Sequence, residues 1–206
     1  MITLHHLNKS RSKRIIWLLE ELGVDYQITA YQRDSVTFLA PPELKAIHPL
    51  GKSPVIEDNG LIIAESAAIT EYLIEHYGQG KFIPARGTPE HTEYLQWLHF
   101  AESSAILPLL LKMFTAKEPV ETQFLSQYAE QEVAKVIEYF DNKLENKRYL
   151  VEDRLTGADI MMSFIAEIVE RNGPIATYPN IQKYLAQLAT HPAFIKANQI
   201  ELDNQA

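Results

Sequence analysis

The fold is decided by the stretch ITLHHLNKSRSKRIIWLLEELG, residues 2–23. Residues 2–7 carry β-branched and apolar side chains in a short run that a polar loop at residues 8–12 cuts off, which predicts a first strand. Apolar residues then recur at helical spacing from residue 14 onward, and Gly23 is placed to end this helix in a left-handed conformation. The sequence therefore opens with a strand, a loop and a helix.

The next segments predict a β-α-β unit followed by a hairpin. Residues 24–31 alternate in the manner of a second strand, and residues 41–43 are typical of the entry to a short helix that ends before His48-Pro49.

Two more short apolar runs, at residues 55–57 and 61–63, are separated by a turn that contains Asn59-Gly60. Because this step supplies the positive φ angles of a tight hairpin, we expect the two runs to be antiparallel neighbours.

The hairpin is followed by helices only. Ser66 is placed to cap a helix that Gly78 closes, so the first half has the order βαβαββα of a thioredoxin-like α/β domain, assigned to residues 1–80. We place the boundary near residues 80–88 and an all-α domain at 88–206. Its helices are expected at about residues 89–114, 120–146, 157–171, 180–189 and 192–199. Thr156 and Asp159 are expected to cap the third of these helices, which makes Asp159 a folding residue.

Composition excludes several classes of function. The formal net charge of −8 offers no basic footprint for a nucleic acid, and no apolar run is long enough for a membrane span. The N-terminal segment lacks the pattern of a secretory signal, which predicts a cytoplasmic protein. No pair of histidines has the helical spacing of a zinc motif, so no metal site is expected.

The chain contains no cysteine, so any thiol chemistry must use a thiol that another molecule brings. The loop between the first strand and the first helix holds Ser10 and Ser12. Backbone amides at a helix N-terminus and a donating serine hydroxyl both stabilise an anionic sulfur. This loop is therefore the expected place for a borrowed thiolate.

Three motifs give the sequence a resemblance to the glutathione transferase family along its whole length. They are residues 10–14 (SRSKR) with the helix at 17–22, residues 48–54 (HPLGKSP), and Glu65-Ser66. The second half agrees through TGAD at residues 156–159 and HPAF at residues 191–194.

The resemblance implies a catalytic role for Ser10, which lies where serine-type members activate the sulfur of glutathione. Ser12 and Asn8 lie in the same loop and remain alternatives for this role, and Ser10 and Ser12 have an alternative as ordinary helix caps. By the same resemblance, the backbone of Ser53 pairs with the cysteinyl part of glutathione. Pro54 is then the cis proline that fixes this turn.

The remaining contacts to the tripeptide are also implied by the resemblance. Glu65 and Ser66 match the acid and the hydroxyl that hold the γ-glutamyl end, and Ser66 lies at a helix N-terminus, where a carboxylate is favoured. Lys52 is a weaker candidate for the glycyl carboxylate. Taken alone, Ser66 has the pattern of a cap and Glu65 that of a solvated acid.

The family resemblance implies a homodimeric enzyme whose co-substrate is glutathione and whose second substrate is a hydrophobic electrophile or a hydroperoxide. Two alternatives stay open at this stage. One is a non-catalytic protein that keeps the fold for binding, and the other is a glutathione-dependent peroxidase or disulfide reductase.

Overall fold

The computed structural model describes residues 1–37, 39–120, 122–172 and 175–204. Its contacts form two compact units, one of residues 1–83 with 188–206 and one of residues 84–187. The sequence-based division placed residues 88–206 together in the helical domain. The contacts group the last helix with the N-terminal unit instead, because this helix packs against the first one.

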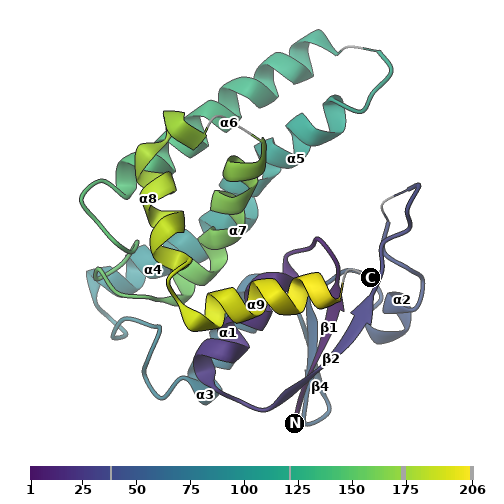
Figure 1. Ribbon diagram of the computed structural model, residues 1–206, viewed down its shortest axis with the longest axis vertical. Coiled ribbons are helices and arrows are strands. Elements are labelled where there is room, and N and C mark those ends of the chain that lie inside the picture. Colours follow the sequence, from purple (N-terminus) through teal and green to yellow (C-terminus); the bar gives the residue numbers. More distant parts are fainter. Residues whose placement is uncertain (38, 121, 173–174, 205–206) are drawn as a thin grey trace. The chain divides into compact units, whose positions relative to one another are not determined.

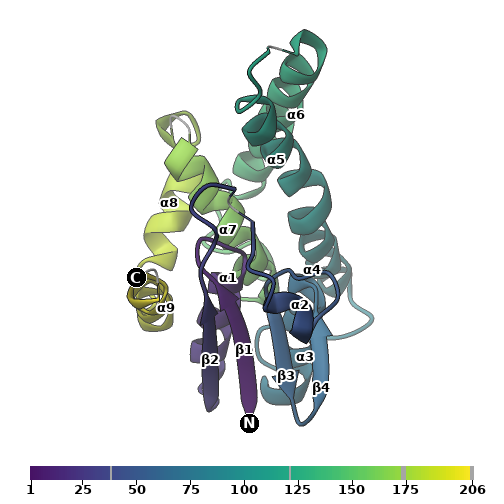
Figure 2. The same ribbon diagram turned by 90° about the vertical axis from the view of Figure 1, so that its right-hand side faces the viewer.

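A four-stranded mixed sheet lies at the centre of the first unit, in the spatial order β2-β1-β3-β4 (Figures 1 and 2). The strands are β1 (Ile2–Leu7), β2 (Tyr26–Tyr31), β3 (Val55–Asp58) and β4 (Leu61–Ala64). β1 pairs with β2 in parallel and with β3 antiparallel, and β3 pairs antiparallel with β4. The turn before β4 has positive φ angles at Asn59 (50°) and Gly60 (83°), as the hairpin prediction requires. The predicted thioredoxin-like fold class is confirmed.

The described residues of this unit form four helices: α1 (Ser12–Leu22), α2 (Leu44–Ile47), α3 (Ser66–Tyr77) and α9 (Pro192–Asp203). α1 and α3 lie behind the sheet in the view of Figure 2. α9 packs along α1, where the rings of Trp17 and Phe194 meet edge to face with their centroids 4.9 Å apart. α1 ends at Gly23, whose φ of 64° confirms the expected left-handed cap.

The two ends of α3 differ from the sequence prediction. Ser66 does not cap the helix: it is the first helical residue, Glu65 precedes it at the cap position, and no side chain makes a capping hydrogen bond there. Gly78 follows the last helical residue but has a φ of −78° rather than a left-handed one. Glycine is needed there for space, because a Cβ atom would lie 2.4 Å from the carbonyl oxygen of Ile74.

The second unit contains helices only in the part of the chain that the structure describes. Its elements are α4 (Pro89–Phe100), the π-helical segment η1 (Ala101–Ala105), α5 (Ile106–Thr115), α6 (Gln123–Lys143), α7 (Gly157–Asn172), the 3₁₀ turn η2 (Ile175–Thr177) and α8 (Pro179–Leu188). The predicted all-α character is confirmed. None of the described helices has both the length and the apolar character needed to cross a bilayer.

The single helix predicted at residues 89–114 is divided by η1. Pro108 lacks the N–H group that would bond the preceding turn, and its ring would clash with a carbonyl there. A wider π turn directly before it relieves this conflict. The start of α4 is as predicted, because the Thr88 hydroxyl accepts the His91 N–H at 3.2 Å.

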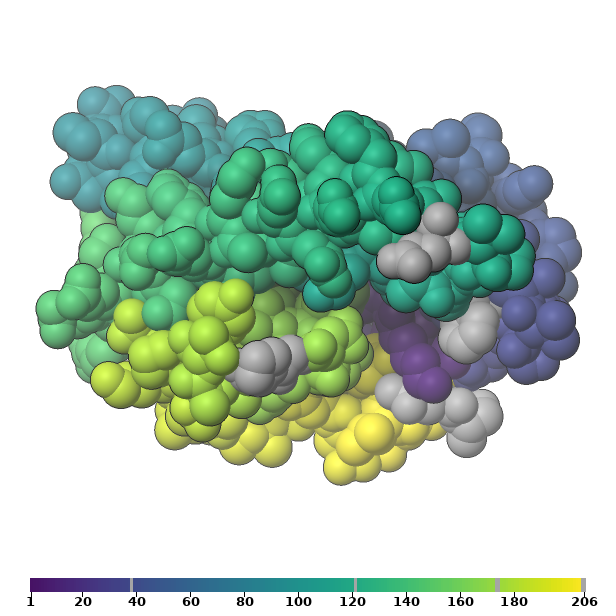
Figure 3. Space-filling view, turned by 90° about the horizontal axis from the view of Figure 1, so that it is seen from above, coloured from purple at the N-terminus to yellow at the C-terminus, as the bar shows by residue number. Residues whose placement is uncertain are grey.

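α6 and α8 lie side by side on the face of the helical unit shown in Figure 3, in green and yellow-green. Asp141 of α6 joins them, because its Oδ1 accepts the backbone N–H groups of Asn180 and Ile181, each at 2.9 Å. These are two of the amides that the first turn of a helix leaves without an internal partner. α6 thus supplies the N-terminal cap of α8.

Asp159 confirms the predicted capping motif at the start of α7. Its Oδ2 accepts the Thr156 N–H at 2.9 Å, and the Thr156 hydroxyl accepts the Ala158 N–H at 3.3 Å. Its Oδ1 also accepts the Leu150 N–H and the Tyr184 hydroxyl, both at 3.0 Å. Complete burial raises the pKa of Asp159 to about 6, against the opposing effect of these hydrogen bonds.

We predict that Asp159→Ala destabilises the protein by about 3 kcal/mol or more, because it leaves several buried donors without an acceptor. Urea unfolding of the variant and of Asp203→Ala, an acid at the exposed end of α9, measures the difference. Equal losses of stability in the two variants would contradict the capping role.

Candidate active site

The register of the sheet brings the predicted site motifs to one end of the first unit. His5 of β1 lies opposite Val55 of β3, and Val55 lies opposite Ala64 of β4. The loop after β1, the turn before β3 and the residues after β4 therefore lie at the same end of the strands. These three segments carry Ser10, Ser53-Pro54 and Glu65-Ser66, respectively.

Ser10 and Ser12 form a hydroxyl pair at the start of α1. Their Oγ atoms are 2.7 Å apart, and Ser10 Oγ also accepts the Ser12 N–H at 3.1 Å. The N-cap residue of α1 is Arg11, which makes no side-chain capping hydrogen bond, so neither serine is the N-cap of this helix. Ser12 is 0% exposed and Ser10 is 6% exposed. Of the two serines, Ser10 is the one that keeps some exposed surface.

The third candidate in this loop is Asn8, which makes hydrogen bonds to Tyr31 and Arg33 at the end of β2. Its Oδ1 accepts the Arg33 N–H at 2.9 Å, its N–H donates to the Tyr31 carbonyl, and its own carbonyl accepts from the Arg33 guanidinium. These bonds fix the loop against the end of β2. The side chain of Asn8 is therefore held by its Oδ1 atom, and only its amide nitrogen could donate to a thiolate.

His6 and Glu201 extend the serine pair into the interior. His6 of β1 is fully buried, and its Nδ1 lies 2.7 Å from Ser12 Oγ. Its Nε2 lies 3.3 Å from Glu201 Oε2 on α9, without the alignment of a hydrogen bond. Burial lowers the pKa of His6, and the carboxylate of Glu201 acts against that shift.

The turn before β3 contains a cis peptide bond between Ser53 and Pro54, as the resemblance implied. The ladder between β1 and β3 ends at Val55. The Ser53 hydroxyl continues it, since it donates to the His5 carbonyl at 2.8 Å and accepts the Leu7 N–H at 3.1 Å. A valine or isoleucine at position 53 could not make these bonds.

The residues after β4 have an unusual backbone. Glu65 is exposed and has a φ of 72°, a conformation that an ordinary side chain adopts only at a cost of about 1–3 kcal/mol. Ser66 beside it is 3% exposed and begins α3. Lys52 is exposed, next to the cis-proline turn. The strained residue places an acid and a hydroxyl together at the N-terminus of a helix, where anions are stabilised.

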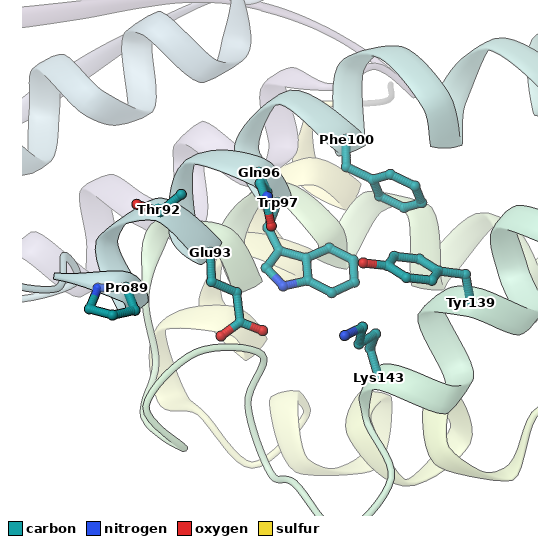
Figure 4. Close-up of a pocket in the computed structure, with 8 residues that line it drawn as sticks. All are labelled: Pro89, Thr92, Glu93, Gln96, Trp97, Phe100, Tyr139 and Lys143. Atoms are coloured by element: carbon teal, nitrogen blue, oxygen red, sulfur yellow. The ribbon is translucent and has the colours of Figure 1, made fainter.

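A separate pocket lies within the helical unit, between α4 and α6 (Figure 4), and has a volume of about 660 Å³. Trp97, Phe100 and Tyr139 form its aromatic wall, and Glu93 and Lys143 stand at its side. The pocket contains none of the predicted site residues. No group of three or more acidic, histidine or cysteine side chains suited to a metal ion occurs among the described residues.

Fold and site together define a protein with a thioredoxin-like unit, a cis-proline turn and serines at the first helix, joined to a helical unit. Comparison with known families gives the same class. The model for the N-terminal domain of glutathione S-transferase matches residues 1–75, and the model for its C-terminal domain matches residues 101–192. The chain belongs to the glutathione S-transferase family.

Individual relatives agree over nearly the whole chain. It is 34% identical to glutathione S-transferase 3 of Schizosaccharomyces pombe, an alignment that covers 98% of this chain and 88% of the relative. It is 30% identical to glutathione S-transferase 1 of Saccharomyces cerevisiae over 97% and 94% of the two chains. The crystal structure of a glutathione S-transferase from Actinobacillus pleuropneumoniae is 41% identical, covers 98% of this chain and 93% of that one, and superposes with a TM-score of 0.89.

Sequence reasoning missed His6 and Glu201. The histidine spacing gives His6 no role in a metal site, but its alternation with Leu4 along β1 indicates that the two side chains share one face of the sheet. Glu201 had no such signal, because only the packing of α9 on α1 brings it near residue 6.

We predict that Ser53→Val destabilises the protein by about 1–3 kcal/mol, because the Leu7 N–H and the His5 carbonyl lose their partner. Urea unfolding checks this, with Ser104→Val on the exposed surface of η1 as the control. A Ser53→Val protein as stable as the control would show that these two bonds contribute nothing.

Proposed function

We propose that this glutathione S-transferase binds glutathione at the shared end of its sheet and that the Ser10 hydroxyl keeps the bound sulfur ionised. Transferase activity accords with the family and with close similarity to named transferases over nearly the full chain. The observation that supports the role of Ser10 is its place: it lies in the loop before α1 and keeps some exposed surface, whereas its partner Ser12 is fully buried.

The chemistry requires a thiol pKa lower than that of free glutathione. A cysteine thiol has a pKa of about 8.5, so only a few per cent of it is ionised at neutral pH. A hydroxyl that donates to the thiolate contributes about 1.5–3 kcal/mol, and the N-terminus of α1 adds a favourable dipole. The resulting thiolate attacks an electrophilic carbon or a peroxide oxygen.

We predict that Ser10→Ala lowers the kcat for conjugation of an aryl halide about 10- to 100-fold, because one hydrogen bond to the thiolate is lost. Steady-state kinetics at neutral pH measures the effect, and calorimetry should show nearly unchanged affinity for glutathione.

Asn8→Ala serves as the matched variant from the same loop, and it should keep its thiolate. Full activity in Ser10→Ala, or a loss confined to Asn8→Ala, would remove Ser10 from the mechanism.

The rest of the proposed glutathione site is formed by the cis-proline turn before β3 and by the residues after β4. The backbone of Ser53 lies beyond the last ladder pair of β3, where it can pair with the cysteinyl part of glutathione. Glu65 supplies a carboxylate for the γ-glutamyl ammonium, and Ser66 supplies a hydroxyl and a helix N-terminus for its carboxylate. Lys52 is exposed, and it is assigned to the glycyl carboxylate. A structure of the same fold, the transferase homologue of Lodderomyces elongisporus, contains two glutathione molecules per subunit (23% identity, TM-score 0.84).

We predict that Ser66→Ala weakens glutathione binding about 10-fold, since it removes one hydrogen bond to a charged group. Calorimetric titration measures the dissociation constant, and Ser104→Ala is the control. If Ser66→Ala binds as tightly as the unaltered protein, the γ-glutamyl end is held elsewhere.

The second substrate is proposed to contact the helical unit, assigned by sequence to residues 88–206. α5 supports a hydrophobic partner, because Leu107, Met113 and Phe114 are all exposed on this short helix. A panel of an aryl halide, an organic hydroperoxide and a small disulfide ranks the transferase reaction against the peroxidase and reductase alternatives. No glutathione-dependent turnover in the panel would favour the non-catalytic alternative.

Two further proposals accord with membership of the family. One is a homodimer, and the other is a cytoplasmic location.

A further inference from the structure

A continuous chain of polar side chains leads from Ser10 into the core of the first unit. It passes from Ser10 Oγ to Ser12 Oγ (2.7 Å), then to His6 Nδ1 (2.7 Å), and from His6 Nε2 to Glu201 Oε2 (3.3 Å). Ser12 and His6 are both 0% exposed. Burial of polar and ionisable groups is costly, so such a chain needs a reason beyond packing.

We propose that Ser12, His6 and Glu201 form a proton relay behind Ser10, which carries the thiol proton of bound glutathione to His6 Nδ1. The proposal rests on the proposed function of Ser10. In this scheme Ser10 touches the substrate, whereas Ser12, His6 and Glu201 act through it.

The step is a proton transfer in which no atom is oxidised or reduced. The S–H bond breaks and its proton moves to Ser10 Oγ, the Ser10 proton moves to Ser12 Oγ, and the Ser12 proton moves to His6 Nδ1. The products are a thiolate and an imidazolium. Each hydrogen bond then points back toward the sulfur: His6 donates to Ser12, Ser12 to Ser10, and Ser10 to the thiolate. The relay therefore removes the proton and leaves every donor oriented to hold the anion.

The charges around His6 fit this role. Burial favours the neutral imidazole before glutathione binds, and the Glu201 carboxylate stabilises the imidazolium that forms. Other ionisable side chains lie on β1 and directly after β2. His5, its neighbour on β1, contacts the Tyr31 hydroxyl of β2, and the guanidinium of Arg33 after β2 interacts with Glu201 and with Arg11.

α1 also contributes a buried cation, Arg14. Among the described residues, the carboxylate of Glu201 is the charged group that raises the pKa of His6.

Glu201 also holds the loop that carries Ser10. Its Oε1 accepts the Lys9 N–H at 2.8 Å, and Lys9 has a left-handed φ of 53°. The same carboxylate thus fixes the loop with one oxygen and faces His6 with the other. Since a glutamine at this position keeps an oxygen for Lys9, Glu201→Gln removes the charge with little change in shape.

The test compares Glu201→Gln and Ser12→Ala with Asn198→Ala. Asn198 also lies on α9 and bonds α1, through Lys13 Nζ at 2.8 Å, but it has no part in the relay. We expect the acid limb of the kcat/KM profile to move to higher pH by about one unit in both relay variants, a loss of about 10-fold on that limb. The KM for glutathione should not change. Asn198→Ala should keep the profile of the unaltered protein.

A second readout follows the proton itself. Nitrogen NMR of His6 should show a neutral ring in the free protein, a protonated ring with glutathione, and a neutral ring with S-methylglutathione, which has no ionisable thiol. A His6 that stays neutral while thiolate is bound would overturn the relay, as would unshifted profiles in both relay variants. If the unaltered protein forms no thiolate at all, the proposed function of Ser10 fails as well, which separates the two failures.

Discussion

The pairing of β1 on both of its edges is the constraint on which the rest of the site depends. Hydrogen bonds to β2 on one side and β3 on the other fix where β1 ends, and the buried Ile2, Leu4 and Leu7 anchor it in the core. A slip of one residue would turn every side chain of the strand to the opposite face. The serine loop, the cis-proline turn and His6 all take their positions from this one register.

The last helix, α9, contributes a further side chain to the site at the end of β1. α9 is distant from β1 in sequence, yet its packing on α1 brings a carboxylate to the loop of Ser10 and to the buried His6. Trp17 and Phe194 supply the apolar contact that holds the two helices together, and the ion pair between Glu20 and Lys196 lies along the same interface. The packing of α9 therefore also determines part of the surroundings of the first loop.

Local patterns predicted much of the fold because they reflect short-range physics. Gly23, the Asn59-Gly60 turn and the Thr156–Asp159 cap each depend on a few neighbouring residues, and the structure confirms all three. The end of α3 was described less well, since the need for glycine at position 78 comes from a close approach to Ile74 rather than from its φ angle.

The division of the long helix around η1 depends on Pro108, whose effect on the preceding turn is not visible in apolar periodicity.

Sequence motifs predicted the part of the candidate site that depends on short segments of the chain. The cis bond before Pro54 is present as expected, whereas the roles of Ser10, Lys52, Ser53, Glu65 and Ser66 toward glutathione stay predictions. What sequence could not supply is the environment behind the serines. The contact between His6 and Glu201 joins residues almost 200 positions apart, and no local pattern encodes it.

We propose that a serine hydroxyl at the head of α1 stabilises the thiolate of bound glutathione. The most direct measurement is a spectroscopic titration of the thiolate of glutathione bound to the unaltered protein across a range of pH. We predict a midpoint clearly below the value of about 8.5 for a free thiol. A midpoint equal to that of glutathione in solution, at saturating occupancy, would contradict it.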